Sequence, residues 1–213
     1  MAAESCPLVV KRRMIRLHFA PLTRSIRIRW LLEELQVEYE LQRSEFNRDG
    51  TKGFAQVTPS GNYPYLEDGD VALSESGAIV QYLLEKYGDG RFEPPIGSRN
   101  RADYLQWLHF AEGTAASPIN TIVWLTVYRQ DADRHVAIIE AVRESAHTVF
   151  SRVEAALATK PFLAGEQFSA ADVMMGFTLG TAKWLQVLNG EHPKTLDYVD
   201  RLFARPALQN ALR

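Results

Sequence analysis

The chain has 213 residues, a formal net charge of −2 and a hydrophobic fraction of 46%. These values are typical of a globular protein with one large or two small domains, and they argue against nucleic acid or an anionic membrane as a partner. No apolar run reaches the roughly 18 residues that a membrane-spanning helix needs. The only cysteine, Cys6, excludes a disulfide within the chain, and this cysteine usage favours a cytosolic location.

Strand and helix patterns alternate in the N-terminal part of the chain. The start, MAAESCPLVVKRRM, has no long apolar core, so we expect a frayed extension and not a secretory signal. Asp68-Gly69 is a dipeptide typical of tight hairpins. The predicted elements are a strand at 14–19, a helix at 24–35, a strand at 37–44, a short helix within 51–61, strands at 63–68 and 70–74, and a further helix.

That further helix begins unusually, with the sequence SESGAIVQYLLEKY. Ser74 is a good N-cap, and Glu75 suits the positive end of a helix. Ser76 and Gly77 in the first turn need another reason, because glycine costs a helix about 0.5–1 kcal/mol relative to alanine. Either a ligand approaches the free N–H groups of this turn, or packing demands a small residue there.

A stretch rich in glycine and proline, GDGRFEPPIGSRN at 88–100, predicts a linker between two domains. Beyond it, apolar residues recur at spacings of three and four, and we find no convincing strand. We therefore predict an α/β domain at 14–88 and an all-helical domain at 100–213.

Four segments in this order resemble a cytosolic glutathione transferase: LHFAPLTRSIRIRWLLEEL, PSGNYPYLEDGD, SESGAIVQYLLEKYG and FSAADVMMG. The resemblance covers nearly the whole chain after the N-terminal extension. It implies a thioredoxin-like domain of order β-α-β-α-β-β-α, followed by a helical bundle. It also implies a homodimer that uses glutathione as a cosubstrate, with no metal.

The resemblance implies that Glu75 and Ser76 hold the γ-glutamyl end of glutathione. A helix N-terminus suits the carboxylate of that group, and Glu75 can meet its ammonium. The alternative is plain helix capping with a surface glutamate.

The resemblance further implies a cis peptide bond before Pro64, which lets the backbone of Tyr63 pair with the cysteinyl backbone of glutathione. A trans proline that opens an edge strand is the alternative. Asn62 and Lys52 are candidates for the glycyl carboxylate, although either could equally be solvated surface.

The thiol of glutathione reacts as its thiolate, which one hydroxyl at the start of the first helix can stabilise together with the helix dipole. Thr23 aligns with the serine that does this in the serine-type classes, and Ser25 is the second candidate. Thr23 could instead only cap the helix. The tyrosine-type classes need Tyr where this chain has His18 and Phe19. The arginines of this helix, Arg24, Arg27 and Arg29, are expected on a solvated face, and Arg24 could also raise the local positive potential.

We expect an apolar pocket between the domains to accept the electrophile. The alternative is that the aromatic candidates for this pocket pack in the core. The candidates are Phe19, Leu22, Trp107, Phe110 and Trp124.

The sequence FSAADVMMG predicts a capping box between Ser169 and Asp172, with a structural role. The histidines have no metal-ligand spacing relative to one another: His18, His109, His135, His147 and His192.

These features predict an enzyme that joins glutathione to small apolar electrophiles. Two alternatives stay open. One is glutathione-dependent peroxide reduction, dehalogenation or isomerisation on the same scaffold. The other is a module without catalytic activity that binds glutathione or a partner protein.

Overall fold

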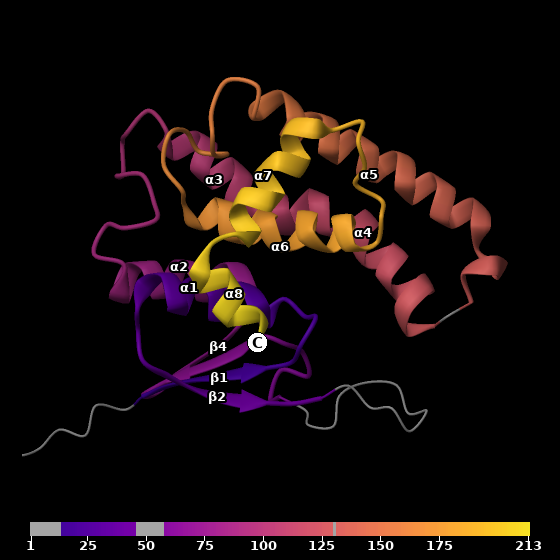
Figure 1. Ribbon diagram of the computed structural model, residues 1–213. Helices are drawn as coiled ribbons and strands as arrows, with labels where there is room; N and C mark the ends of the chain where they lie inside the picture. The colour runs from indigo at the N-terminus through magenta and orange to yellow at the C-terminus, as the bar shows by residue number, and fades with distance from the viewer. Residues whose placement is uncertain (1–13, 46–57, 130) are drawn as a thin grey trace, which may run out of the picture.

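The computed structural model describes residues 14–45, 58–129 and 131–213, and it begins with a mixed sheet (Figure 1). The strands are β1 (Ile15–Phe19), β2 (Tyr39–Arg43), β3 (Tyr65–Asp68) and β4 (Val71–Ser74). Their order in the sheet is β2-β1-β3-β4, with β1 parallel to β2 and the other two pairs antiparallel. Alternate residues of β1 are buried, which is the period expected of a strand with one face on the core.

Two helices, α1 (Ser25–Leu35) and α2 (Ser76–Tyr87), lie on the face of the sheet toward the remaining helices (Figure 1). Their buried residues recur at helical spacing and pack against the buried side of β1. This arrangement confirms the predicted thioredoxin-like domain. The short helix predicted within 51–61 falls mostly outside the described residues.

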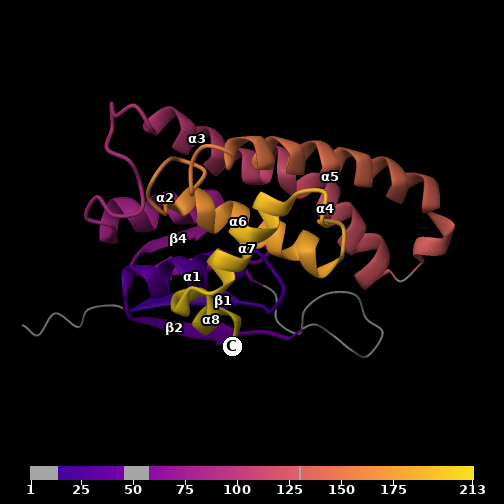
Figure 2. The ribbon, with the colours of Figure 1, turned by 45° about the horizontal axis from the view of Figure 1, so that its top comes forward.

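The rest of the chain is helical, as predicted. Its α-helices are α3 (Arg101–Phe110), α4 (Ala116–Val123), α5 (Val136–Ala156), α6 (Ala170–Trp184), α7 (Pro193–Phe203) and α8 (Pro206–Leu212). The last helix, α8, returns to the N-terminal part and lies beside α1 (Figures 1 and 2). None of the described helices is long and apolar enough to cross a membrane.

The β3–β4 hairpin leads directly into α2. Two predicted details of this region, the turn residues and the N-cap of α2, were wrong. The turn residues are Gly69 and Asp70, with Gly69 at a φ of 66°, where glycine is favoured. Ser74 is the last residue of β4 and not the N-cap of α2; the N-cap is Glu75, whose side chain makes no capping hydrogen bond. Glu75 lies at φ 68° and ψ 111°, a combination that non-glycine residues seldom adopt.

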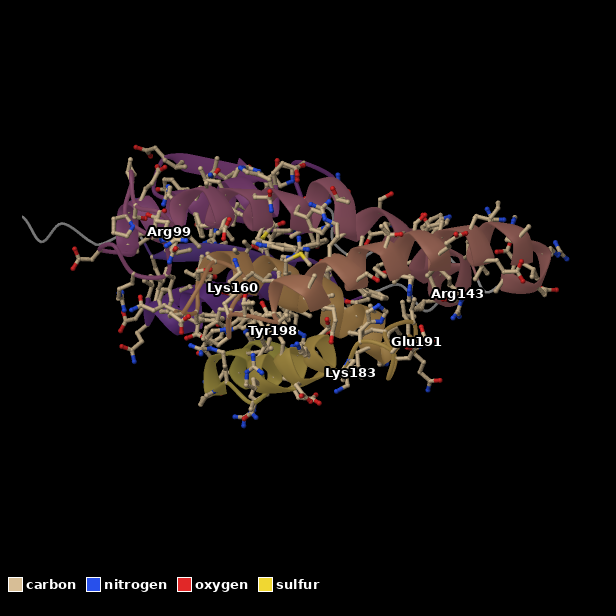
Figure 3. All side chains as sticks on the ribbon, turned by 90° about the horizontal axis from the view of Figure 1, so that it is seen from above. Arg99, Arg143, Lys160, Lys183, Glu191 and Tyr198 are labelled. Atoms are coloured by element: carbon tan, nitrogen blue, oxygen red, sulfur yellow. The ribbon has the colours of Figure 1, made fainter. Side chains whose placement is uncertain are left out.

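The predicted capping box at the start of α6 is confirmed, and its carboxylate has further partners. Asp172 is fully buried and accepts hydrogen bonds from the backbone of Ser169 at 2.8 Å and of Leu163 at 3.0 Å. The hydroxyls of Ser169 and Tyr198 donate to it at 2.9 and 2.6 Å. Tyr198 belongs to α7 (Figure 3), so this one carboxylate joins α6 to a neighbouring helix and loop.

A buried arginine joins the α/β domain to the helices. Arg27 of α1 is 0% exposed, so its predicted place on a solvated face was wrong. Its guanidinium donates to Ser76 Oγ at 3.0 Å, to Thr178 Oγ1 at 2.8 Å, and to the Glu112 carboxylate. Arg24 donates to the same carboxylate at 2.9 Å. The three partners of Arg27 come from α2, α6 and the turn between α3 and α4.

Arg24 and Arg29 also have partners but keep part of their contact with solvent, and the Arg24 side chain is 38% exposed. Arg29 is partly buried and donates to the hydroxyl of Tyr39 at 3.2 Å and to the Ala211 carbonyl of α8 at 3.2 Å. The pattern of residue types along α1 could not reveal these contacts, because the partners come from distant parts of the chain.

Glu112 reaches the two arginines from a π-helical turn, Ala111–Ala115, which joins α3 to α4. A π turn is wider than an α turn and changes the direction of the side chains that follow, and such turns are frequent at functional sites. Burial favours the neutral carboxyl, but the charges of Arg27 and Arg24 outweigh it and lower the pKa of Glu112.

Asp172→Ala should destabilise the fold by at least about 3 kcal/mol, because four buried donors lose their acceptor and each orphaned donor costs roughly 1–3 kcal/mol. Tyr198→Phe removes one donor and should cost only about 1 kcal/mol. Urea denaturation of both variants measures the difference. Equal stabilities would show that Asp172 does not hold this junction.

Glu112→Gln should destabilise the protein more than Arg24→Gln. The first change leaves the buried Arg27 charge without its counter-ion, which costs roughly 3–5 kcal/mol for a fully buried pair, and less here because Glu112 is partly exposed. The second removes a surface ion pair worth about 0–1 kcal/mol. Urea denaturation again gives the comparison, and equal losses would contradict the role of Arg27 as the buried partner.

The same pair predicts a pH dependence. Because folding lowers the pKa of Glu112 below its ordinary value of 4.5, its contribution to stability is present above that pH and is lost as the pH falls. Stability measured from pH 7 to pH 3 should therefore fall less steeply below about pH 4.5 in Glu112→Gln than in the parent. Parallel curves would contradict this assignment.

Candidate functional site

A cleft of about 580 Å³ lies between the α/β domain and the helices. One wall comes from the turn between β1 and α1 and from the loop before β3. The other comes from α4, from the π-helical turn Trp124–Tyr128 that follows it, and from α6. The cleft is therefore closed on the α/β side by loop residues and on the other side by helix faces.

Thr23 lines the cleft at the start of α1, and its hydroxyl belongs to a compact polar group. Thr23 Oγ1 lies 2.7 Å from the Ala20 carbonyl oxygen and 2.6 Å from Ser25 Oγ, and it accepts the Ser25 backbone N–H at 3.2 Å. Ser25 Oγ lies 2.9 Å from the same carbonyl. Two hydroxyl protons thus serve one carbonyl, so Ser25 alone can satisfy it while the Thr23 proton turns to the cleft.

Ser25 itself is 0% exposed and does not line the cleft. Its hydroxyl also accepts the Ala20 N–H at 3.1 Å, which holds it inside the turn. Ser25, the second candidate for the catalytic hydroxyl, therefore lies behind Thr23 inside the turn, and its catalytic role stays a prediction. Leu22, 70% exposed with φ 61°, forms the rim of the cleft beside Thr23.

The loop before β3 brings Asn62 and Tyr63 to the cleft. The peptide bond between Tyr63 and Pro64 is cis. Thr58 donates its hydroxyl to the Asn62 carbonyl at 2.7 Å, which holds the loop in place. Asn62, Tyr63 and Thr23 line the same cavity.

Glu75 and Ser76 lie at the N-terminus of α2, outside the lining of the cleft. Glu75 is exposed, whereas Ser76 is buried and accepts a hydrogen bond from Arg27, which does line the cleft. A Cβ atom placed on Gly77 would lie 4.0 Å from Met174 Cε, an ordinary contact, so packing does not demand glycine there. Lys52 lies outside the described residues.

Three of the five predicted acceptor-pocket residues belong to the core and not to the cleft. Phe19, Trp107 and Phe110 are 2%, 4% and 6% exposed and do not line the cavity. Trp107 and Phe110 pack edge to face, with ring centroids 5.1 Å apart. Leu22 and Trp124 do line it, and Trp124 is 49% exposed.

Most residues of the helical wall were not predicted from the sequence. Ala116, Ile119, Asn120 and Val123 follow one face of α4 at spacings of three and four, so the 3.6-residue period could have revealed them. The proline within that segment obscured the pattern. The other missed residues of the cleft are Arg24, Arg27, Gly61, Tyr128, Phe177, Thr178 and Thr181.

The cleft combines positive charge with apolar walls. The guanidinium groups of Arg24 and Arg27 lie at its α/β end, and Ile119, Val123 and Phe177 supply apolar surface. Burial raises the pKa of Tyr128 despite the opposing charge of Arg24, so its phenol stays protonated at neutral pH. Such a site suits an anionic nucleophile beside an apolar reactant.

Comparison with known proteins identifies the family. Residues 14–85 match the profile of the glutathione S-transferase N-terminal domain, and residues 136–206 match that of the glutathione S-transferase C-terminal domain. Glutathione S-transferase 3 of Schizosaccharomyces pombe is 31% identical over 182 residues, which are 80% of this chain and 75% of that protein.

Two further proteins are similar over more of the chain. The disulfide-bond oxidoreductase YfcG of Escherichia coli is 26% identical over 214 residues, covering 93% of this chain and 94% of that protein. A crystal structure of a glutathione S-transferase from Actinobacillus pleuropneumoniae superposes with a TM-score of 0.76 and 30% identity, covering 93% and 91% of the two chains. The matched domains, their order and the fold agree, and the chain belongs to the glutathione S-transferase family.

Proposed function

We propose that this protein is a glutathione transferase that adds the thiolate of glutathione to small apolar electrophiles. The observation that carries the proposal is the Thr23 hydroxyl, which opens on a cleft with apolar helices on its far side. In the reaction, a sulfur lone pair forms the new carbon–sulfur bond. In a displacement, the leaving group departs with the electrons of its broken bond to carbon. In an addition, the π bond of the acceptor breaks, and its electron pair stays on the acceptor and takes up a proton from water.

The chemical difficulty is the thiol, which is mostly protonated at pH 7. A hydroxyl donor and the positive end of a helix both favour the thiolate. Thr23 supplies the donor at the start of α1, and Ser25 keeps the Ala20 carbonyl satisfied when the Thr23 proton turns to sulfur. Arg24 and Arg27 line the same cleft, and with the Glu112 carboxylate that pairs with both they leave one net positive charge there.

The N-terminus of α2 is our proposed site for the γ-glutamyl group. The backbone conformation of Glu75 is one that costs a non-glycine residue roughly 1–3 kcal/mol, and such residues gather at ligand sites. Its carboxylate is exposed and suits the ammonium group, while the Ser76 hydroxyl and the free N–H groups of this first turn suit the carboxylate. Arg27 holds the Ser76 hydroxyl in place.

The rest of glutathione would extend toward the loop before β3. The backbone of Tyr63, ahead of the cis bond to Pro64, is proposed to pair with the cysteinyl residue. Asn62 is proposed for the glycyl carboxylate, and Lys52 stays a second proposal for that group. The electrophile would then contact Leu22, Trp124 and the face of α4 that lines the cleft.

A second candidate is a disulfide oxidoreductase, favoured by the similarity to the disulfide-bond oxidoreductase YfcG. The chain has only Cys6, so a dithiol of its own cannot supply the chemistry. Two glutathione molecules would have to provide both thiols. Assays with a panel of aryl and alkyl electrophiles, peroxides and small disulfides separate these reactions, and activity with none of them would favour a binding module.

For the oligomeric state and the cellular role, we propose a homodimer in the cytosol that takes part in detoxification. Analytical sedimentation tests whether the protein is a dimer.

Thr23→Val should raise the thiol pKa of bound glutathione and lower turnover near neutral pH, because it removes the donor and nearly keeps the shape. We expect a loss smaller than the roughly 10²–10³-fold of an oxyanion donor, since the helix dipole remains. Thiolate absorbance followed against pH gives the direct measurement.

Two variants serve as controls. Thr23→Ser keeps the hydroxyl and should keep the activity. Ser25→Ala should lower stability more than it changes the thiol pKa, because Ser25 is buried. A shifted thiol pKa in Ser25→Ala with none in Thr23→Val would make Ser25 the donor. No shift in either variant would mean that backbone N–H groups alone stabilise the thiolate.

Glu75→Gln and Glu75→Gly should both weaken glutathione binding by about 1–3 kcal/mol through loss of a charge-assisted hydrogen bond. Glu75→Gly should also raise the stability of the free protein, because glycine adopts this backbone conformation without strain. Calorimetry with glutathione and thermal unfolding measure the two effects. Glutathione affinity equal to that of the parent in both variants would rule out the proposed role.

A further inference from the structure

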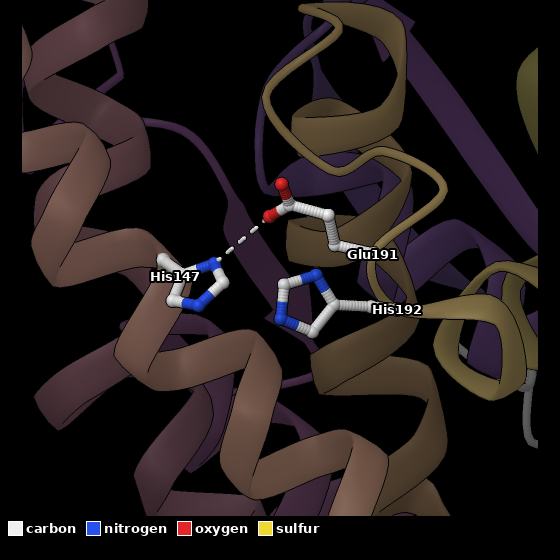
Figure 4. Close-up of side chains that lie close together, drawn as sticks. All are labelled: His147, Glu191 and His192. Carbon is white, nitrogen blue, oxygen red and sulfur yellow. Dashed lines mark ion pairs between the residues drawn. The ribbon is translucent and has the colours of Figure 1, made fainter.

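Three potential metal ligands from two segments converge on the surface of the helical domain, away from the cleft. His147 lies on α5, and Glu191 and His192 lie in the segment between α6 and α7. One ligand atom from each side chain lies within 4.8 Å of the others. Figure 4 shows the two imidazole rings side by side, with the Glu191 carboxylate above them, and Figure 3 places Glu191 beside α5.

His192 is the anchored member of the cluster. It is 4% exposed, and its Nδ1 is enclosed without a hydrogen-bond partner among the described residues. Its Nε2 lies 3.4 Å from Ser151 Oγ, and its ring packs edge to face on Phe150 at 5.5 Å. In the tautomer whose Nε2–H points to Ser151, the unpartnered Nδ1 keeps a lone pair for another group.

The position of His192 is held by contacts that do not use its imidazole nitrogens. Glu154 of α5 accepts the backbone N–H groups of Lys194 at 3.0 Å and of Thr195 at 2.8 Å, and the Thr195 hydroxyl at 2.7 Å. This carboxylate therefore caps α7 and fixes its start to α5. These contacts hold the backbone at the start of α7, so the Nδ1 atom of His192 is not needed to keep the residue in place.

The other two members are exposed, with side-chain exposures of 55% for His147 and 68% for Glu191. Their contact, His147 Nδ1 to Glu191 Oε2, is 3.6 Å, too long for a hydrogen bond. The ring centroids of His147 and His192 lie 4.7 Å apart. The two rings meet edge to face, and this contact, together with the nearby Glu191 carboxylate, brings two imidazoles and one carboxylate within reach of a single ion.

We propose that His147, Glu191 and His192 bind a divalent transition metal ion, best represented by Zn²⁺. Two imidazoles and one carboxylate are a ligand set that zinc accepts, with water as the fourth ligand. Ligand atoms around a tetrahedral zinc lie roughly 3.4 Å apart for bonds of about 2.0–2.1 Å. Rotation of the two exposed side chains can close the present spacing, while Ser151 orients His192 from outside the metal.

The ion would clip the middle of α5 to the start of α7. None of its ligands lines the cleft, so catalysis does not require the ion. The expected consequence is a gain in thermal stability that saturates with zinc concentration, because the ion binds the folded chain in preference to the unfolded one.

Zinc binding should be measured on the full-length, untagged protein after removal of metal with a chelator. A Cys6→Ser background excludes the only thiol. Isothermal titration with ZnCl₂, without glutathione, should show one equivalent bound, and the unfolding temperature should rise with zinc. His147→Ala and Glu191→Gln should each weaken binding at least tenfold and remove the zinc-dependent rise in unfolding temperature.

His135→Ala is the matched control, because His135 also faces a carboxylate, Asp131 at 3.4 Å, but has no second histidine beside it among the described residues. This variant should bind zinc like the parent. Substitution with Co²⁺ gives a second readout: its visible absorption should appear in the parent and in His135→Ala, and should vanish in His147→Ala. Failure of the parent to bind zinc, or unchanged binding in His147→Ala, would overturn the proposal. Neither outcome bears on transferase activity, which is assayed separately.

Discussion

The buried charge of Arg27 is the constraint on which the arrangement of the molecule depends. A guanidinium at 0% exposure loses its hydration, and that loss is tolerated only when a counter-charge and hydrogen-bond acceptors replace the water. Glu112, Ser76 and Thr178 replace it from three separate segments, and the ring of Phe177 lies 5.2 Å from the guanidinium carbon. Each of those segments must therefore meet α1 in one orientation. The α/β domain and the helices are joined through this point.

The same contact links stability to the site. Arg27 touches Ser76, beside the proposed γ-glutamyl site, and it also lines the cleft that Thr23 opens on. Glu112 holds it from the π turn that leads into α4, the helix that forms the apolar wall. A change at Arg27 would thus disturb both halves of the proposed reaction site at once. Thr23 is positioned differently, through short-range hydrogen bonds to Ala20 and Ser25, so its hydroxyl can be altered without loosening the junction.

Features decided within a few residues were predictable, and features decided across the chain were not. The capping box needs only Ser169 and Asp172, three positions apart, and it was predicted correctly. The donors that reach Asp172 from Leu163 and Tyr198 could not be predicted, since they come from separate segments. Trp107 and Phe110 show the same limit: aromatic residues at helical spacing have one pattern whether they face a core or a cleft. The family resemblance, and not any spacing, led to the cis bond before Pro64.

By itself, the sequence determined the strands and the main helices, the mixed and helical parts, the hairpin and the cap of α6, because backbone propensity and side-chain period act locally. It also placed Thr23 at a helix start, where a hydroxyl has a chemical use. Only the tertiary structure decided that Ser25 is buried, that Arg27 carries a buried charge, and that His147 and His192 meet. The physical reason is that burial and charge pairing depend on which distant segments pack together. That choice is made by the whole chain, and no local pattern records it.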